Sequence, residues 1–257
     1  MQCDEKWSFV AKKQKRCDLQ DPADHSKGDC WDYVAYDPQH KLVLSVIVGR
    51  RCNRRALELM AVVKQKVKLP SQARARRKAK SRKKAKSRRK AHALLLATDG
   101  YTAYPRAMTL TFGLPPPKGL AYAVVDKQRD EQGRLRGVTT RPVWGSMRSI
   151  EQALRDSPVS TTVNTSFLER HNGTDRHRNA RKARRTYRFS KDWLIHEAVT
   201  YFTYYTYNFC WCVRTLRSKR KQNGRHPPRT PALAAGLSDH VWTLHEWLSQ
   251  IVLGLYS

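Results

Sequence analysis

The chain has 257 residues, with 51 Lys and Arg against 21 Asp and Glu, which gives a formal net charge of +30. Such a charge favours a polyanionic partner, either nucleic acid or an anionic membrane surface. No apolar run of about 18 residues occurs, and residues 1–15 lack the apolar core of a signal peptide, which argues against a transmembrane or secreted protein. The sequence therefore predicts a cytoplasmic protein that binds nucleic acid and no membrane.

The first part of the chain has the pattern of three strands and a helix. Residues 4–11 alternate and carry aromatic side chains, and two further apolar stretches lie on either side of a turn with the sequence Asp37-Pro38-Gln39-His40. A polar segment with Pro22 and Gly28 separates the first strand from the second. The expected elements are strands at 4–11, 31–36 and 42–48, a long hairpin loop at 12–29, and a helix at 52–67.

A low-complexity basic tract, Arg74 to Lys90, follows this helix and contains no acidic residue. One interpretation is a solvated, disordered insertion. The other is a tether that binds DNA phosphates, with Lys84 and Arg88 as candidate contacts and a steep dependence on salt. Disorder is compatible with both.

A fourth strand, short and apolar, is expected at 93–98, and Asp99-Gly100 follows it. A carboxylate at the carboxyl end of a buried strand lies where open α/β sheets bind ligands. The chain then predicts a helix at 101–107, a strand at 120–125 and a loop at 133–138.

Ser166 is the expected N-cap of a helix that starts at Phe167. Beyond it, basic residues recur at helical spacing and predict one charged face that contacts DNA phosphates: Arg178, Arg181, Lys182 and Arg185. The alternative is a face that is merely solvated.

A long aromatic helix is predicted at 193–216, with a stripe formed by Tyr201, Tyr204, Tyr205 and Asn208. Core packing is the favoured interpretation of this stripe, and base stacking is the alternative. A basic linker at 217–229 and a tail at 231–255 follow, in which we expect Trp242, Leu244 and Trp247 to pack back on the body.

The six cysteines form no Cys-x-x-Cys pair, and we interpret them as reduced thiols. A zinc site that uses Cys210, Cys212 and a histidine is an alternative to simple packing.

Three carboxylates, Asp4, Asp99 and Glu169, each lie at the edge of an apolar or aromatic segment. Three such carboxylates, in the order Asp, Asp, Glu, are what a two-metal phosphoryl-transfer site needs. Carboxylate oxygens suit Mg²⁺, and two ions can hold the attacking and leaving oxygens of a phosphodiester. We therefore predict a site for Mg²⁺ or Mn²⁺ that acts on DNA.

Each of these carboxylates has a simpler interpretation. Asp4 is also consistent with a solvated strand residue, and Glu5 replaces it as ligand if the register slips by one. Asp99 before Gly fits a turn, and Ser166-x-x-Glu169 fits a capping box. Fallback ligands are Asp32, Asp126 and Glu197, and we expect His171 and His196 to be packing or surface residues rather than general bases.

Three strands, a helix, a fourth strand that ends in Asp and a later helix with Glu form the order of an RNase H-like α/β fold. Within this order the chain resembles transposases of the first-described bacterial insertion-sequence family. The resemblance covers most of the chain, and the motifs that carry it are 4–10 (DEKWSFV), 98–104 (TDGYTAY), 166–172 (SFLERHN), 189–191 (FSK), 207–210 (YNFC) and 230–237 (TPALAAGL).

The resemblance implies that residues 1–216 form a DDE catalytic domain with a mixed sheet flanked by helices and a basic insertion at 74–90, and that 217–257 form a linker and helical extension. It implies Asp4, Asp99 and Glu169 as ligands of Mg²⁺ or Mn²⁺, with Arg170 and Asn172 at flanking positions. We also expect Arg170 to contact DNA. The resemblance also implies transposon ends and target DNA as substrates, a homo-oligomer on paired ends, and a bacterial, nucleoid-associated location.

Members of this family usually carry a DNA-binding region before the first Asp, whereas this chain starts three residues before Asp4. We therefore expect that region to be absent and the first strand to pair poorly near Asp4. The alternative function is that of a truncated, inactive remnant that binds DNA without cleaving it. An RNase H-like nuclease with another role is a third possibility.

Overall fold

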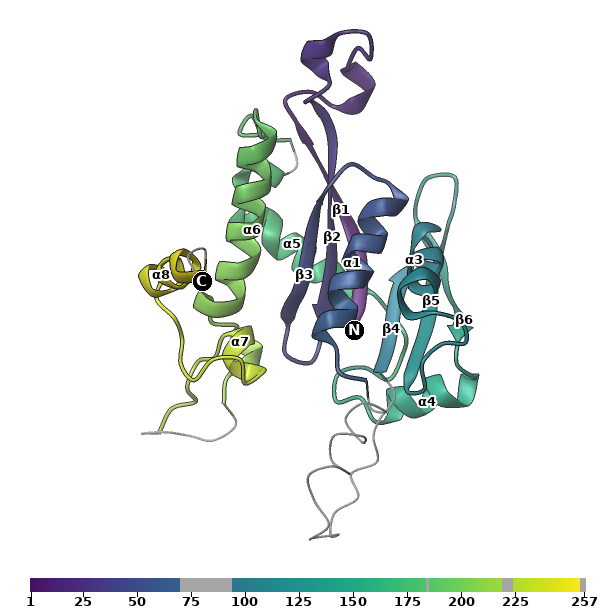
Figure 1. Cartoon of the computed structure of the whole chain (residues 1–257). Coiled ribbons are helices and arrows are strands. Elements are labelled where there is room, and N and C mark those ends of the chain that lie inside the picture. The colour runs from purple at the N-terminus through teal and green to yellow at the C-terminus, as the bar shows by residue number, and fades with distance from the viewer. Residues whose placement is uncertain (70–93, 184, 219–223, 255–257) are drawn as a thin grey trace.

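The computed structural model describes residues 1–69, 94–183, 185–218 and 224–254, and within them the chain forms an α/β fold around a mixed six-stranded sheet (Figure 1). The strands are β1 (Gln2–Val10), β2 (Gly28–Asp37), β3 (Leu42–Gly49), β4 (Leu94–Asp99), β5 (Leu120–Arg129) and β6 (Leu135–Trp144). The helices are α1 (Asn53–Lys66), α3 (Ala103–Phe112), α4 (Met147–Arg155), α5 (Ser166–Arg178), α6 (Trp193–Cys210), α7 (Pro231–Ala234) and α8 (Leu244–Gly254). The sheet order is β3-β2-β1-β4-β5-β6.

The first three strands form an antiparallel meander, as the sequence predicts. β1 pairs with β2 from Gln2 to Val10, so the expected poor pairing near Asp4 is wrong. The loop between them projects beyond the rest of the sheet (Figure 1). The turn into β3 is held by Asp37 Oδ1, which accepts a hydrogen bond of 2.9 Å from the backbone N–H of Gln39.

β4 and β5 run parallel to β1 in the middle of the sheet, and β6 is antiparallel to β5. Both faces of the sheet are covered. Helices α1 and α3 bury Leu59, Met60 and Tyr104 on one face, and α5 and α6 bury Leu168, Tyr204 and Tyr207 on the other. Because both faces are buried, the central strands are apolar at successive positions.

Two elements, the edge strand β6 and the helix α4, differ from the sequence prediction. Residues 135–138 of the expected loop at 133–138 belong to β6, whose side chains are almost all exposed or half-buried, and α4 was not predicted. An edge strand without a buried face shows no alternation of apolar residues, which removes the usual signal.

The C-terminal part also departs from expectation. α6 ends at Cys210 rather than 216, and the basic residues after α5 do not continue a helix: Ala180–Lys182 form a 3-10 turn and Arg185 has a positive φ of 55°. Trp242 packs on Phe209 and Trp247 on Phe202, as expected, whereas Leu244 is 48% exposed and does not. The search of the described residues for a helix long and apolar enough to cross a membrane found none.

Candidate metal centre

Asp4 and Asp99 lie side by side because β1 and β4 are parallel neighbours. Cys3 is paired with Thr98, so the next residue of each strand brings its carboxylate to the end of β4. Glu5 joins them, and one carboxylate oxygen from each of the three residues lies within 4.8 Å of the others. We call Asp4, Glu5 and Asp99 the carboxylate cluster. It is the one such group of potential metal ligands within the described residues, and neither Cys210 nor Cys212 belongs to one.

Hydrogen bonds from the surrounding backbone and from α5 orient two of these carboxylates. Asp4 Oδ1 accepts from the Glu5 N–H at 2.9 Å, and Asp4 Oδ2 accepts from Asn172 Nδ2 at 3.1 Å. Asp99 Oδ1 accepts from the Tyr101 N–H at 3.2 Å, which is the turn bond expected of an Asp before Gly. The turn interpretation of Asp99 and its membership in the cluster are therefore compatible.

Glu5 is the residue that the sequence analysis ranked below Asp4. Its side chain is buried, and Arg51 Nη2 lies 2.5 Å from Glu5 Oε1. The guanidinium of Arg51 is itself held over the rings of Tyr101 and Trp31, with 4.2 and 4.6 Å to the centroids. Glu5 reaches the cluster without a slip of register: Cys3 remains opposite Thr98, and Asp99 is the last residue of β4.

The cluster carries more negative charge than its surroundings neutralise. Burial, together with the charges of Asp99 and Glu5, raises the pKa of Asp4 to about 7. Burial also raises the pKa of Glu5 and of Asp99, although Arg51 opposes the shift in both. Carboxylates held close together in this way favour a bound cation, so the residues present fit a metal ion.

Glu169 lies in the first turn of α5 and outside this group of three. Burial would raise its pKa, but the ion pair with Lys127 Nζ and the hydrogen bond from Thr165 Oγ1 at 2.5 Å outweigh burial and lower it. Its charge nevertheless contributes to the raised pKa of both Asp4 and Asp99. Of the predicted triad, the structure thus brings two carboxylates together and leaves the third beside them, paired with a lysine.

The capping-box interpretation of Glu169 does not describe these contacts. The N-cap of α5 is Thr165, one residue before the predicted Ser166, and its hydroxyl makes no capping bond. The bonds of the Glu169 carboxylate come from two side chains, those of Lys127 and Thr165. The predicted N-cap at Ser166 is therefore wrong by one residue.

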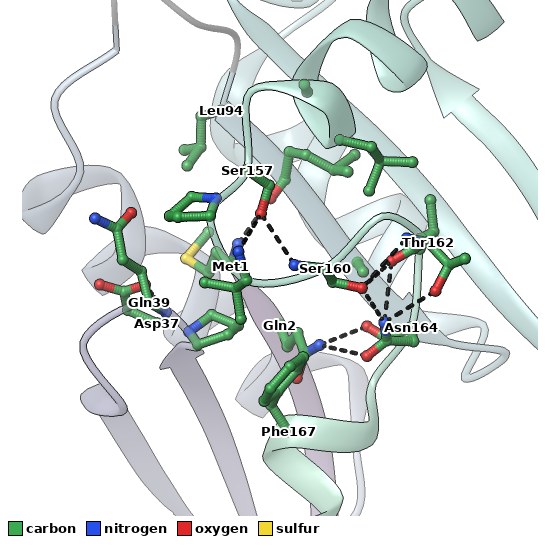
Figure 2. A pocket seen from close by; sticks show the side chains of 18 of the residues that line it. Met1, Gln2, Asp37, Gln39, Leu94, Ser157, Ser160, Thr162, Asn164 and Phe167 are labelled. Atoms are coloured by element: carbon green, nitrogen blue, oxygen red, sulfur yellow. Dashed lines mark hydrogen bonds between the residues drawn. The ribbon is translucent and has the colours of Figure 1, made fainter. Parts of the chain in front are cut away.

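The start of α5 is fixed to β1 through Gln2 (Figure 2). Gln2 Nε2 donates to the Asn164 carbonyl at 2.7 Å, and Gln2 Oε1 accepts from the Leu168 N–H at 2.9 Å. These bonds place Glu169 and, one turn later, Asn172 over the strand that carries Asp4. The cavity beside Gln2 has a volume of about 290 Å³ and lies at the opposite end of β4 from Asp99.

A buried group of four charges holds the other end of α5. Lys6 is paired with Asp175 and, at 3.2 Å, with Asp32, and Lys182 lies 2.5 Å from Asp32. These four side chains are at most 2% exposed. We call Lys6, Asp32, Asp175 and Lys182 the buried charge quartet.

The quartet decides two of the sequence predictions. Asp32, a fallback ligand, is used for ion pairing and its pKa is lowered to about 2: burial opposes this shift, and the charges of Lys182 and Lys6 outweigh it. Lys182 was predicted to contact DNA; this is corrected, because its ammonium is buried against Asp32. The spacing of basic residues gave no sign of an acidic partner 150 residues away.

The other predicted DNA contacts fall into three groups. Arg170 and Arg185 are exposed and Arg181 is half-buried. Arg178 packs on α6, where its guanidinium lies 4.7 Å from the centroid of Trp211 and donates to the Thr203 carbonyl at 3.3 Å. Lys84 and Arg88, with the tract 74–90, lie outside the described residues.

The remaining candidates are placed as follows. Asp126 lies on β5, 3.5 Å from Arg141, and lines a hollow of about 520 Å³ together with Asp99 and Lys127, while Glu197 lies on α6.

His171 and His196 are buried, which lowers their pKa to about 3 and about 4, so both are neutral packing residues at neutral pH. The tyrosine stripe of α6 also packs in the core, and Asn208 bonds both the N–H and the carbonyl of Val43.

In comparisons with known proteins, the chain matches no protein-family model, no curated protein and no solved structure.

Proposed function

We propose that the chain is a metal-dependent enzyme of DNA phosphoryl transfer, a DDE transposase with an RNase H-like fold. The observation that carries this proposal is the placement of Asp4 and Asp99 on adjacent parallel strands, with Glu169 on α5, the helix whose Asn172 donates a hydrogen bond to Asp4. The order β3-β2-β1-β4-β5, with β4 and β5 parallel to β1, is compatible with an RNase H-like fold. The resemblance of the motifs around these three residues points in the same direction.

In this proposal Asp4, Asp99 and Glu169 hold Mg²⁺ or Mn²⁺, and Glu5 shares the cluster. Metal bound there would lower the pKa of water or of a DNA 3′-hydroxyl and neutralise charge on the phosphate. Asn172 fixes the orientation of Asp4, and Arg51 and Lys127 bring positive charge to the rim of the cluster. Transposon ends and target DNA are the proposed substrates, and a homo-oligomer on paired ends in a bacterial nucleoid is the proposed working form.

The net charge of +30 supports a nucleic-acid substrate independently of the carboxylates. Exposed Arg170 and Arg185, with Arg181, are the proposed phosphate contacts near α5.

Nicking of supercoiled plasmid by the purified chain in Mn²⁺ tests this function. We expect nicking by the wild type, loss of nicking in Glu169→Gln, and no change in Glu151→Gln, an exposed carboxylate on α4 that serves as the matched control. Equal nicking by Glu169→Gln would contradict the assignment. Binding of plasmid at low salt without nicking by any variant would favour the inactive DNA-binding remnant instead.

A further inference from the structure

A groove of about 810 Å³ runs along one edge of β1, beyond the point where β4 ends. β4 is paired with β1 at Gln2 and Cys3, whereas β2 follows β1 along its whole length. In the described part of the chain, the next backbone pairing on this edge is the isolated bridge between Val10 and Ser190. The edge between these points is lined instead by side chains from α5 and from residues within 181–183 and 185–189.

One wall of the groove is aromatic. Trp7 and Phe9 lie on the same face of β1, with ring centroids 5.8 Å apart, and Phe189 packs on Phe9 at 5.0 Å. Tyr187 lines the same groove with 97% of its surface exposed. The other three rings are half-buried, and aromatic rings that remain open to solvent along a groove indicate a binding surface rather than a core.

The rest of the groove is cationic. Its lining includes Lys13, Arg176, Arg181 and Arg185, and no Asp or Glu is among the lining residues. Lys13 Nζ lies 5.7 Å from the centroid of Trp7, so charge and ring are presented together. Aromatic platforms beside Arg and Lys are the combination that binds single-stranded nucleic acid, since bases stack on the rings and phosphates pair with the cations.

The groove begins next to the carboxylate cluster. Glu5 and Trp7 are successive residues on one face of β1, about 7 Å apart at the usual rise of a strand. Bases inside a duplex have both faces covered by their neighbours, so rings such as those of Trp7 and Tyr187 can stack only on bases that have left the stack.

We propose that this groove binds unpaired nucleotides of the DNA strand that flank the phosphate at the carboxylate cluster. Their bases stack on Trp7 and Tyr187, and their phosphates pair with Arg181 and Arg185. The choice of DNA rests on the function proposed above. The groove then gives the enzyme a preference for locally melted DNA at the cleavage point, which the carboxylates alone do not provide.

The test uses a short single-stranded oligonucleotide that carries 2-aminopurine, whose fluorescence is quenched when it stacks on an aromatic ring. It is titrated with the whole chain in EDTA, so that no metal-dependent chemistry contributes. We compare the wild type with Tyr187→Ala and Trp7→Ala. Trp211→Ala is the matched control, since Trp211 is 50% exposed and follows the far end of α6.

We expect quenching with the wild type and the control, and an affinity about fivefold or more weaker in Tyr187→Ala and Trp7→Ala, the lower limit for loss of one base–aromatic stack. Tyr187→Ala alone decides the question if Trp7→Ala does not fold, because Tyr187 is almost fully exposed. Absence of quenching by the wild type, quenching by both variants at the wild-type affinity, or equal affinity of the wild type for the fully paired duplex would overturn the proposal.

The two proposals fail separately. Stacking that depends on Tyr187, in a protein that does not nick plasmid, would leave the groove assigned and remove the catalytic function. Glu169-dependent nicking without such stacking would keep the function and remove the groove.

Discussion

Asn172 Nδ2 lies 3.1 Å from Asp4 Oδ2 and so joins α5 to β1, one helical turn beyond Glu169. Asn172 is 5% exposed. A buried amide that donates to the Asp4 carboxylate fixes the direction in which the remaining lone pairs of that carboxylate point. Asn172 is therefore a positioning residue for the proposed metal ligand Asp4.

Asn172→Ala should therefore weaken the apparent affinity for Mn²⁺ in plasmid nicking by about 10-fold to 100-fold, the usual effect of removing a partner of a metal ligand. The Mn²⁺ dependence of the nicking rate measures this. Thr174→Ala, on the same helix but bonded to the Arg170 carbonyl, is the control and should leave the dependence unchanged. An unaltered Mn²⁺ dependence in Asn172→Ala would show that the bond to Asp4 has no role.

The raised pKa of Asp4 predicts how the stability of the metal-free protein depends on pH. The folded protein keeps the proton of Asp4 up to about pH 7, whereas the unfolded chain releases it near its ordinary value of 3.8. Because the folded state holds the Asp4 proton in this window and the unfolded state does not, the contribution of Asp4 to stability should fall as the pH rises from about 4 to about 7, by on the order of 2–4 kcal/mol.

Thermal melts of the wild type and of Asp4→Asn in EDTA at pH 5 and pH 7.5 isolate this contribution, because the lowered pKa of the buried His171 and His196 raises stability with pH in both proteins. The melting temperature of the wild type relative to that of Asp4→Asn should be lower at pH 7.5 than at pH 5. Added Mn²⁺ should restore the melting temperature at pH 7.5 in the wild type and not in Asp4→Asn. A difference in melting temperature between the wild type and Asp4→Asn that is the same at the two pH values in EDTA would contradict the prediction.

The buried charge quartet predicts a large loss of stability from one substitution. Asp175→Asn leaves the ammonium of Lys6 with only Asp32, which it shares with Lys182, and removing one partner of a buried pair usually costs about 3–5 kcal/mol. Urea denaturation measures the change. The exposed pair of Arg155 and Glu151 is the control, where Arg155→Met should cost less than about 1 kcal/mol. Equal effects of the two substitutions would show that the quartet adds little.

Lys127 pairs with the carboxylate of Glu169. In the proposed metal centre it would compete there with a metal ion. Lys127→Met should therefore lower the Mn²⁺ concentration needed for half-maximal binding, by about twofold to fivefold, because both side chains are partly exposed and the pair is weak. Arg141→Met, which removes the partner of the neighbouring Asp126, is the control. Weaker Mn²⁺ binding in Lys127→Met would mean that the lysine supports the site rather than competing for it.

The sequence predicted the central strands and α1 because their apolar residues recur with clear periods or lie in short buried runs. It placed the start of α5 one residue late, from the capping residue alone. It missed β6, whose exposed residues on both faces leave no such pattern. Asp4 and Asp99 lie side by side because β1 and β4 pair in parallel. The order of strands and helices along the chain suggested this pairing, but no local sequence pattern contains it. Lys182 was misplaced because only the folded chain brings Asp32 to it, and the aromatic groove escaped notice because Trp7 and Tyr187 lie 180 residues apart.

The central claim is that Asp4, Asp99 and Glu169 form one divalent-metal centre. Mn²⁺ binding to the purified chain, followed by electron paramagnetic resonance, tests it most directly. The account predicts that Asp4→Asn and Asp99→Asn lose this binding, that Glu169→Gln weakens it, and that Glu151→Gln binds as the wild type does. Binding of equal strength by the wild type and by the double variant Asp4→Asn/Asp99→Asn would contradict the account.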